Sequence, residues 1–85
     1  MIRLQHNKVN NDPLLIKARE MTKEFHGNGG NCIVNGVTYT YSAIEFFEGA
    51  QRMYIATINR NGQLSNGKAS CLPEAYAQAF KSFIQ

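Results

Sequence analysis

The stretch CIVNGVTYTY, residues 32–41, decides how the middle of this chain folds. It places an Asn-Gly pair between two runs rich in β-branched and aromatic residues, and this pair readily adopts the positive φ angles of a tight hairpin turn. With a two-residue turn, Val34 lies opposite Val37 and Cys32 lies opposite Tyr39. Side-chain alternation then puts these four residues and Tyr41 on one face, which we expect to be the core face. The opposite face is then formed by Ile33, Thr38 and Thr40.

The Asn-Gly pair occurs three more times, at 28–29, 61–62 and 66–67. The pair at 61–62 follows a strand-like run and predicts a second hairpin with a short return strand at 63–65. The pair at 66–67 is interpreted as a further turn.

Residues 42–50 fit two structures, because a capping-box pattern favours a helix while the β-forming side chains favour a strand. We favour the strand, since the strand-like segment that follows needs a neighbour.

Two helices are predicted to flank the strands. Asp12 is a good N-cap before Pro13, and apolar residues at helical spacing predict a helix over 12–26. A second apolar stripe predicts a helix over 73–84. The residues of that stripe are Tyr76, Ala79, Phe80 and Phe83. Residues 1–10 show no periodicity and are interpreted as a polar leader or an edge strand.

The expected fold is a small α+β domain that spans 1–85. Its antiparallel meander of three to five strands occupies 31–65, and both helices pack on one sheet face.

Composition excludes several classes of protein. The chain has 85 residues, of which 44% are hydrophobic and 18% are charged, with a formal net charge of +3. These values are typical of a single globular domain. No apolar run approaches the roughly 20 residues of a membrane-spanning helix, and the first residues lack the apolar core of a signal peptide. We therefore expect a cytoplasmic protein with no membrane partner.

No constellation of residues points to catalysis, a metal or a cofactor. Cys32 and Cys71 lie far apart without zinc-type spacing, so we expect two reduced, packed thiols, with a disulfide as the alternative. A Cys–His pair of Cys32 with His26 would need a reactive thiol, whereas Cys32 is predicted to face the core. Glu45 and Glu48 would point to opposite sides of a strand and would be neighbours on a helix, so they make no evident acid–base pair and we expect an exposed acidic patch. We predict no catalytic residue, no metal ligand and no cofactor, and hence not an enzyme.

The last third of the chain carries a resemblance. Residues 52–83 resemble the final strands and helix of AP2-type and phage-integrase arm-binding DNA-binding domains. The residues that match that pattern are Tyr54, Ala56, Ile58, Asn61, Gly62, Glu74 and Ala75. The resemblance implies that the sheet enters a DNA groove, with Arg52 and Arg60 as contacts, although the leading helix is extra.

The order helix, strands, helix is also similar to a double-stranded RNA-binding domain. Residues 71–73 read Cys-Leu-Pro where that family has a lysine pair.

Two binding functions follow from the surface residues. The candidate nucleic-acid contacts are Arg52, Arg60 and Lys68, and nucleic acid gains support if they cluster on one face without Glu45 and Glu48. The candidate protein-interface residues are Phe46, Phe47, Tyr41 and Tyr54.

We favour a non-catalytic protein-binding module, because the charge excess is small and aromatic residues are many. Small size and the lack of an active-site set are typical of adaptors and of phage or mobile-element inhibitors of a host protein. The alternative is a nucleic-acid-binding domain that uses the exposed sheet face, and edge-to-edge pairing of strands would give a homodimer.

Overall fold

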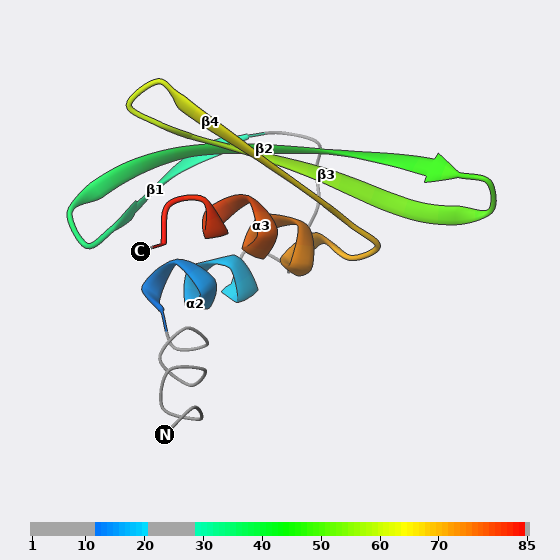
Figure 1. The fold of residues 1–85 in the computed structure, drawn as a ribbon, viewed down its shortest axis with the longest axis horizontal. Coiled ribbons are helices and arrows are strands. Elements are labelled where there is room, and N and C mark those ends of the chain that lie inside the picture. The colour runs from blue at the N-terminus through cyan, green and yellow to red at the C-terminus, as the bar shows by residue number, and fades with distance from the viewer. Residues whose placement is uncertain (1–11, 21–28, 85) are drawn as a thin grey trace.

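The computed structural model of this protein describes residues 12–20 and 29–84. These residues form an antiparallel sheet with strand order β1-β2-β3-β4 and two helices. The elements in chain order are α2 (Pro13–Glu20), β1 (Gly30–Val34), β2 (Val37–Glu48), β3 (Gln51–Arg60), β4 (Gln63–Ala69) and α3 (Leu72–Lys81). Both helices lie on the same side of the sheet (Figure 1). The predicted α+β meander with a helix at each end is therefore confirmed, and residues 42–48 belong to a strand rather than a helix.

Three two-residue turns connect the strands. Asn35 and Gly36 have φ angles of 53° and 80°, and Asn61 and Gly62 have 53° and 90°, as type I′ turns require. The turn between β2 and β3 instead begins with Gly49, whose φ is 62°. The predicted pairings of Val34 with Val37 and Cys32 with Tyr39 are confirmed. The first hairpin therefore has the register that the Asn-Gly pair dictates.

The Asn-Gly pair at 66–67 forms no turn, so that prediction is wrong. Both residues lie inside β4, which continues to Ala69 instead of stopping at residue 65. A Cβ atom on Gly67 would collide with the carbonyl oxygen of Ala75 and would lie 2.6 Å from the amide nitrogen of Ala79. Glycine is present here because α3 presses against the strand, and not because the chain reverses. The pair at 28–29 lies partly outside the described residues.

Helix α2 begins as predicted. The Leu14 amide donates to the Asp12 side chain over 2.9 Å, and the Leu15 amide donates to the Asp12 carbonyl over the same distance. Leu14 and Ala18 are buried where α2 packs against α3 and β1. The remainder of the predicted helix, residues 21–26, and the predicted leader at 1–10 lie outside the described residues.

Helix α3 begins at Leu72, one residue before the predicted start at 73. It ends at Lys81, three residues before the predicted end at 84. Its N-cap residue is Cys71, which makes no side-chain capping hydrogen bond. Cys71 is also exposed, which corrects the prediction of two packed thiols, whereas Cys32 is buried. A thiol at the start of the helix lies outside the stripe that faces the sheet. The predicted stripe itself is confirmed, with Phe80 fully buried and Phe83 partly buried against the core.

The core lies between α3 and the sheet. Ala43, Ala56 and Gly67 lie in one row across β2, β3 and β4, and α3 packs against the part of this row on β3 and β4. Their small size allows α3 to approach closely, and the aromatic rings fill the space to the side. Tyr39 meets Phe80 edge to face, with ring centroids 5.6 Å apart. The structure therefore uses small residues under the helix axis and large ones around it.

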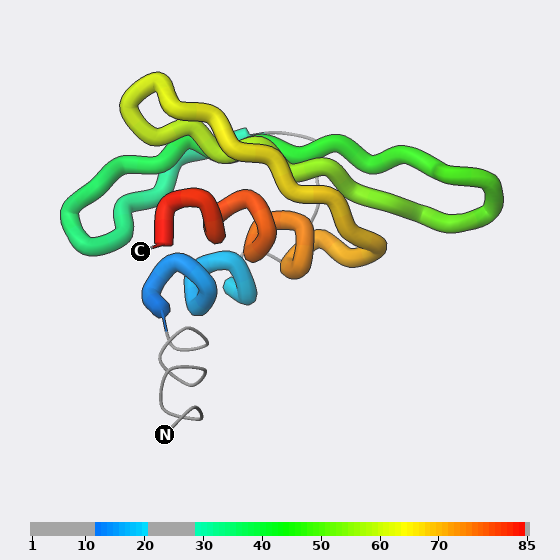
Figure 2. Tube along the Cα trace, in the orientation of Figure 1, coloured from blue at the N-terminus to red at the C-terminus, as the bar shows by residue number. Residues whose placement is uncertain are grey.

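The hairpin of β2 and β3 extends beyond the helices (Figure 2). Strand β1 pairs with β2 only up to Tyr41, and β4 pairs with β3 only from Tyr54 onward. Residues 44–55, which we call the arm, therefore form an end of the sheet that β1 does not reach and that β4 reaches only at Tyr54 and Ile55.

Candidate binding surface

No described element covers the sheet face that points away from the helices (Figure 1). We call it the open face. Strand register and side-chain alternation define its members. They are Asn31, Ile33, Thr38, Thr40, Ser42, Ile44, Phe46, Glu48, Gln51, Met53, Ile55, Thr57, Asn59, Leu64, Asn66 and Lys68. Glu48 and Lys68 are the charged residues among them.

Apolar side chains are prominent on the open face. Ile33, Leu64 and Ile44 are 70%, 67% and 59% exposed. Ile44 lies directly opposite Ile55, and the next pair along the arm is Phe46 with Met53. These two cross-strand pairs form a continuous apolar strip, while Ile33 and Leu64 stand on the outer strands. Sequence reasoning missed Ile33, Ile44 and Leu64 as surface residues of interest, although continuing the alternation from the first hairpin along β2 would have found Ile44.

The polar side chains of the open face bond to each other without adding charge. The Thr40 hydroxyl donates to the Asn31 side-chain oxygen over 3.1 Å, and the Thr57 hydroxyl donates to that of Asn66 over 2.8 Å. Each bond joins neighbouring strands, which ties β1 to β2 and β3 to β4. The face is therefore held in shape by neutral pairs.

The two charges of the open face neutralise each other. The Lys68 ammonium group pairs with the Glu48 carboxylate and also lies 5.6 Å from the centroid of the Phe46 ring. Lys68 therefore reaches along the apolar strip to the end of the arm. The open face as a whole carries no net charge.

The other two predicted nucleic-acid contacts lie on the helix side of the sheet. Arg52 is near the end of the arm, where its Nε is 3.6 Å from a Glu45 oxygen and its guanidinium is 5.7 Å from the Phe47 ring centroid. Arg60 lies at the opposite end of β3, with its guanidinium 4.5 Å from the Phe83 ring centroid. Eight residues of strand separate the two arginines by about 27 Å.

The structure therefore does not bring the three predicted cations together. Lys68 is on one face of the sheet, and Arg52 and Arg60 are at two ends of the other. Glu45 and Glu48 pair with two of the three.

The four predicted interface aromatics are also divided. Phe47 is 59% exposed on the helix side of the arm, whereas Phe46 is partly buried on the open face. Tyr54 donates its hydroxyl to Glu45 over 3.0 Å. Tyr41 packs its ring edge to face against Tyr76 of α3, with centroids 5.7 Å apart. Phe47 is thus the one that combines an aromatic ring with high exposure.

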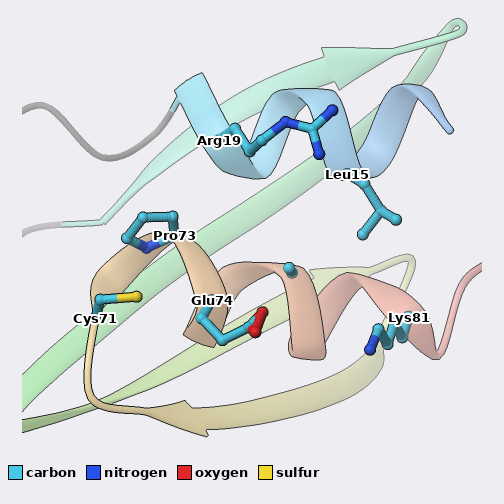
Figure 3. A pocket seen from close by; sticks show the side chains of 7 residues that line it. Leu15, Arg19, Cys71, Pro73, Glu74 and Lys81 are labelled. Atoms are coloured by element: carbon cyan, nitrogen blue, oxygen red, sulfur yellow. The ribbon is translucent and has the colours of Figure 1, made fainter. Parts of the chain in front are cut away.

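A groove of about 410 Å³ runs between α2 and α3 (Figure 3). Leu15 and Arg19 line it from α2, and the remaining lining comes from α3 and the residue before it. That lining consists of Cys71, Pro73, Glu74, Ala77 and Lys81. The groove is open and mixes both signs of charge. Within the described residues there is no histidine and no group of side chains that could hold a metal ion. His26, the partner considered for Cys32, lies outside them.

Two buried groups are kept in their neutral forms. Burial raises the pKa of the Cys32 thiol, although the charge of Lys17 opposes this effect. Burial, with smaller contributions from Tyr41 and Cys32, raises the pKa of Tyr76 to about 12. A buried neutral thiol is a poor nucleophile. Cys32 is therefore a packing residue in this structure.

Comparison of the chain with protein families, with curated proteins and with solved structures finds no match. Neither of the two described helices has the length and hydropathy of a membrane span.

Proposed function

We propose that this protein is a non-catalytic protein-binding module and that the open face of its sheet contacts the partner. The observation that carries this proposal is the chemistry of the open face, which combines three strongly exposed aliphatic residues with zero net charge. The cores of protein interfaces are depleted in charged residues in the same way.

A sheet face that only meets water has a different composition. The solvated face of an antiparallel sheet is usually polar, while the opposite face is hydrophobic. Along the arm, Ile44, Ile55, Phe46 and Met53 form an apolar strip instead. Covering such a strip contributes roughly 25 cal/mol for each Å² of apolar area removed from water. The partner that fits this face is a neutral, largely apolar protein surface.

Such a module acts by occupying a surface of its partner, as adaptors and inhibitors do. Inhibition of a host protein by a phage or mobile-element product is one form of this action. The proposal needs no chemistry from the chain itself, which agrees with the buried, neutral state of Cys32.

Nucleic-acid binding by the open face has less support. Affinity for nucleic acid depends mainly on cations that neutralise phosphates. The open face offers Lys68, whose charge is already opposed by Glu48, while Arg52 and Arg60 lie on the other side.

The test compares two variants with exposed apolar residues replaced by threonine. Ile33→Thr/Leu64→Thr alters the outer strands of the open face, and Ile16→Thr alters an exposed residue of α2 away from the sheet as a matched control. Each protein serves as bait for candidate partners, and the affinity of each captured partner is then measured by titration. We expect the double variant to lose at least tenfold in affinity and the control to keep it. Equal affinity for both variants would exclude the open face.

Fluorescence anisotropy with mixed-sequence DNA and RNA at low and moderate salt tests the alternative. We expect no salt-sensitive binding at micromolar protein. Salt-sensitive binding that Lys68→Ala or Arg52→Ala/Arg60→Ala weakens would instead support nucleic acid.

A further inference from the structure

We propose that a second copy of this chain pairs with the outer edge of β2 along the arm, antiparallel, about a twofold axis at Glu45. The two four-stranded sheets then join into one continuous sheet. This inference concerns the edge of the sheet and does not rest on the function proposed for its open face.

Unpaired backbone groups on the arm are the first support. In a hairpin with a two-residue turn, the two residues that flank the turn bond to each other, and bonding alternates from there. Glu48 pairs with Gln51 in this way, so the backbone groups of Ala43, Glu45 and Phe47 point away from β3. The register of β1 ends at Tyr41, and no other described strand continues along that edge. A row of outward N–H and C=O groups is a template for another strand.

Side chains of the same molecule bond to outward backbone groups at two other places on the sheet edges. On β4, the Gln78 side chain of α3 accepts the outward amide of Lys68 over 3.2 Å. On the arm side of β3, the Gln51 side chain donates to the outward carbonyl of Arg52 over 3.2 Å. The edge of β2 carries no proline or lysine between residues 42 and 48. The edge of β2 along the arm therefore has neither such a side-chain bond nor a proline or lysine, and the charged residue among its outward positions is Glu45.

Geometry selects the register. Only residues 43, 45 and 47 present outward groups. All three can pair with the second copy only when residue 43 meets residue 47, residue 45 meets residue 45, and residue 47 meets residue 43. A twofold axis at Glu45 achieves this, because residue 43 then meets residue 47 of the second copy and each Glu45 meets its equivalent. An axis moved by one residue leaves one of the three unpaired. The paired segment covers residues 43–47, which lie beyond Gly29, the residue that packs beside Tyr41 and Ser42.

Side chains complement each other in this register. On the open side, Ile44 of each copy lies beside Phe46 of the second copy, which extends the apolar strip across the joint. On the helix side, the large exposed Phe47 lies beside the small Ala43 of the second copy. Continuity of the strip is what identifies the occupant as another copy, since the same two apolar residues serve both sides of an isologous contact.

The twofold axis also places the two Glu45 side chains next to each other, which opposes pairing. Arg52, with its Nε 3.6 Å from Glu45, compensates that charge within each copy. This arrangement gives the proposal a specific signature: removing the charge at position 45 strengthens the dimer.

The first experiment measures molar mass over a wide concentration range by sedimentation equilibrium. We expect a reversible monomer–dimer equilibrium for the natural chain. Glu45→Pro removes an outward N–H that makes no bond within the chain, so this variant keeps its circular dichroism spectrum and stays monomeric. Glu45→Gln is the matched control and dimerises several-fold more tightly. A natural chain that stays monomeric throughout, or a dimer that tolerates Glu45→Pro, would overturn the proposal.

A second experiment tests the register without relying on the proline variant. In a Cys71→Ser background, which removes the exposed natural thiol, Glu45→Cys and Phe47→Cys are each treated with oxidised glutathione. Position 45 meets its own equivalent at a Cα separation of about 5.5 Å, which permits a disulfide, whereas position 47 does not meet itself. We expect Glu45→Cys to form a covalent dimer at least tenfold faster. Equal rates would contradict the twofold axis at Glu45.

Discussion

The two faces of one sheet can be compared at a single position, where α3 crosses. On the helix side, the row across β2, β3 and β4 consists of Ala43, Ala56 and Gly67. One residue further along each strand toward the arm, on the opposite side, the corresponding row contains Ile44, Ile55 and Lys68. The backbone and its hydrogen bonds are shared, so the difference lies in the side chains alone.

This difference teaches that small size, and not hydrophobicity, defines the core face under the helix. In this row the larger apolar groups, Ile44 and Ile55, lie on the side that meets no described element. A helix packs closely on a sheet only where the side chains below it are small, and a row of residues with little or no side chain provides such a surface. The opposite side has no such requirement, and its aliphatic groups are therefore available to a partner.

The largest loss of stability is expected where α3 lies closest to the sheet, at Gly67. Gly67→Ala places a methyl group against the backbone of Ala75 and Ala79, which cannot move without shifting α3. We expect a loss of about 3 kcal/mol or more in the free energy of unfolding, measured with denaturant.

Gly62→Ala is the matched control, since nothing lies within 4 Å of its added methyl and the strain comes from a φ of 90° alone. We expect about 1–2 kcal/mol there. A larger loss for Gly62→Ala than for Gly67→Ala would mean that α3 does not rest on Gly67.

A smaller loss of stability is expected at high pH, where the buried Tyr76 hydroxyl of α3 ionises. Folding raises the pKa of Tyr76 from 10.0 to about 12, so above pH 10 the unfolded chain releases this proton more readily than the folded chain. The contribution of Tyr76 is thus complete below pH 10 and is lost as the pH rises through 12. We expect a loss of about 2–3 kcal/mol over this interval.

Denaturant unfolding at several pH values measures this loss for the natural chain and for Tyr76→Phe. We expect the variant to lose less stability over the same interval. Identical pH profiles would show that the ring is not buried as described.

The smallest effect is expected when a single methyl group is removed, and the same removal can be compared on the two faces of the sheet. Ile58→Val removes one methyl group from a fully buried side chain on the helix side, and Ile33→Val removes one from a side chain that is 70% exposed on the open face. We expect about 1 kcal/mol for the first and within about 0.5 kcal/mol of zero for the second. Thermal unfolding of the two variants side by side provides the measurement. A clear destabilisation by Ile33→Val would mean that the open face is already covered in the isolated protein.

Local signals in the sequence were sufficient for the architecture. Asn-Gly pairs between β-forming runs fixed two turns and the register of the first hairpin, because turn geometry and alternation are properties of neighbouring residues. The cap at Asp12 and the apolar stripe of α3 were readable for the same reason.

The features that the sequence did not predict depend on contacts between residues far apart in the chain. Asn66-Gly67 looks like a turn, and only the position of α3 explains why it is a strand. The positions of the candidate site residues could not be predicted for the same reason. The side of the sheet on which Arg52 or Lys68 lies depends on the pairing register of three successive strands. The open-face aliphatics were missed because an isolated isoleucine is ordinary in a strand, and its exposure becomes meaningful only once the helices are placed.

The strand order β1-β2-β3-β4 follows the order of the chain, and each step between strands is a turn of two residues. Each pairing therefore closes a very short loop and loses little chain entropy in doing so. The contact between α2 and α3 joins segments more than fifty residues apart and loses the most. We therefore expect the folding rate of this molecule to depend less on its β-structure than is usual for sheet proteins, because most strand pairings are local in sequence.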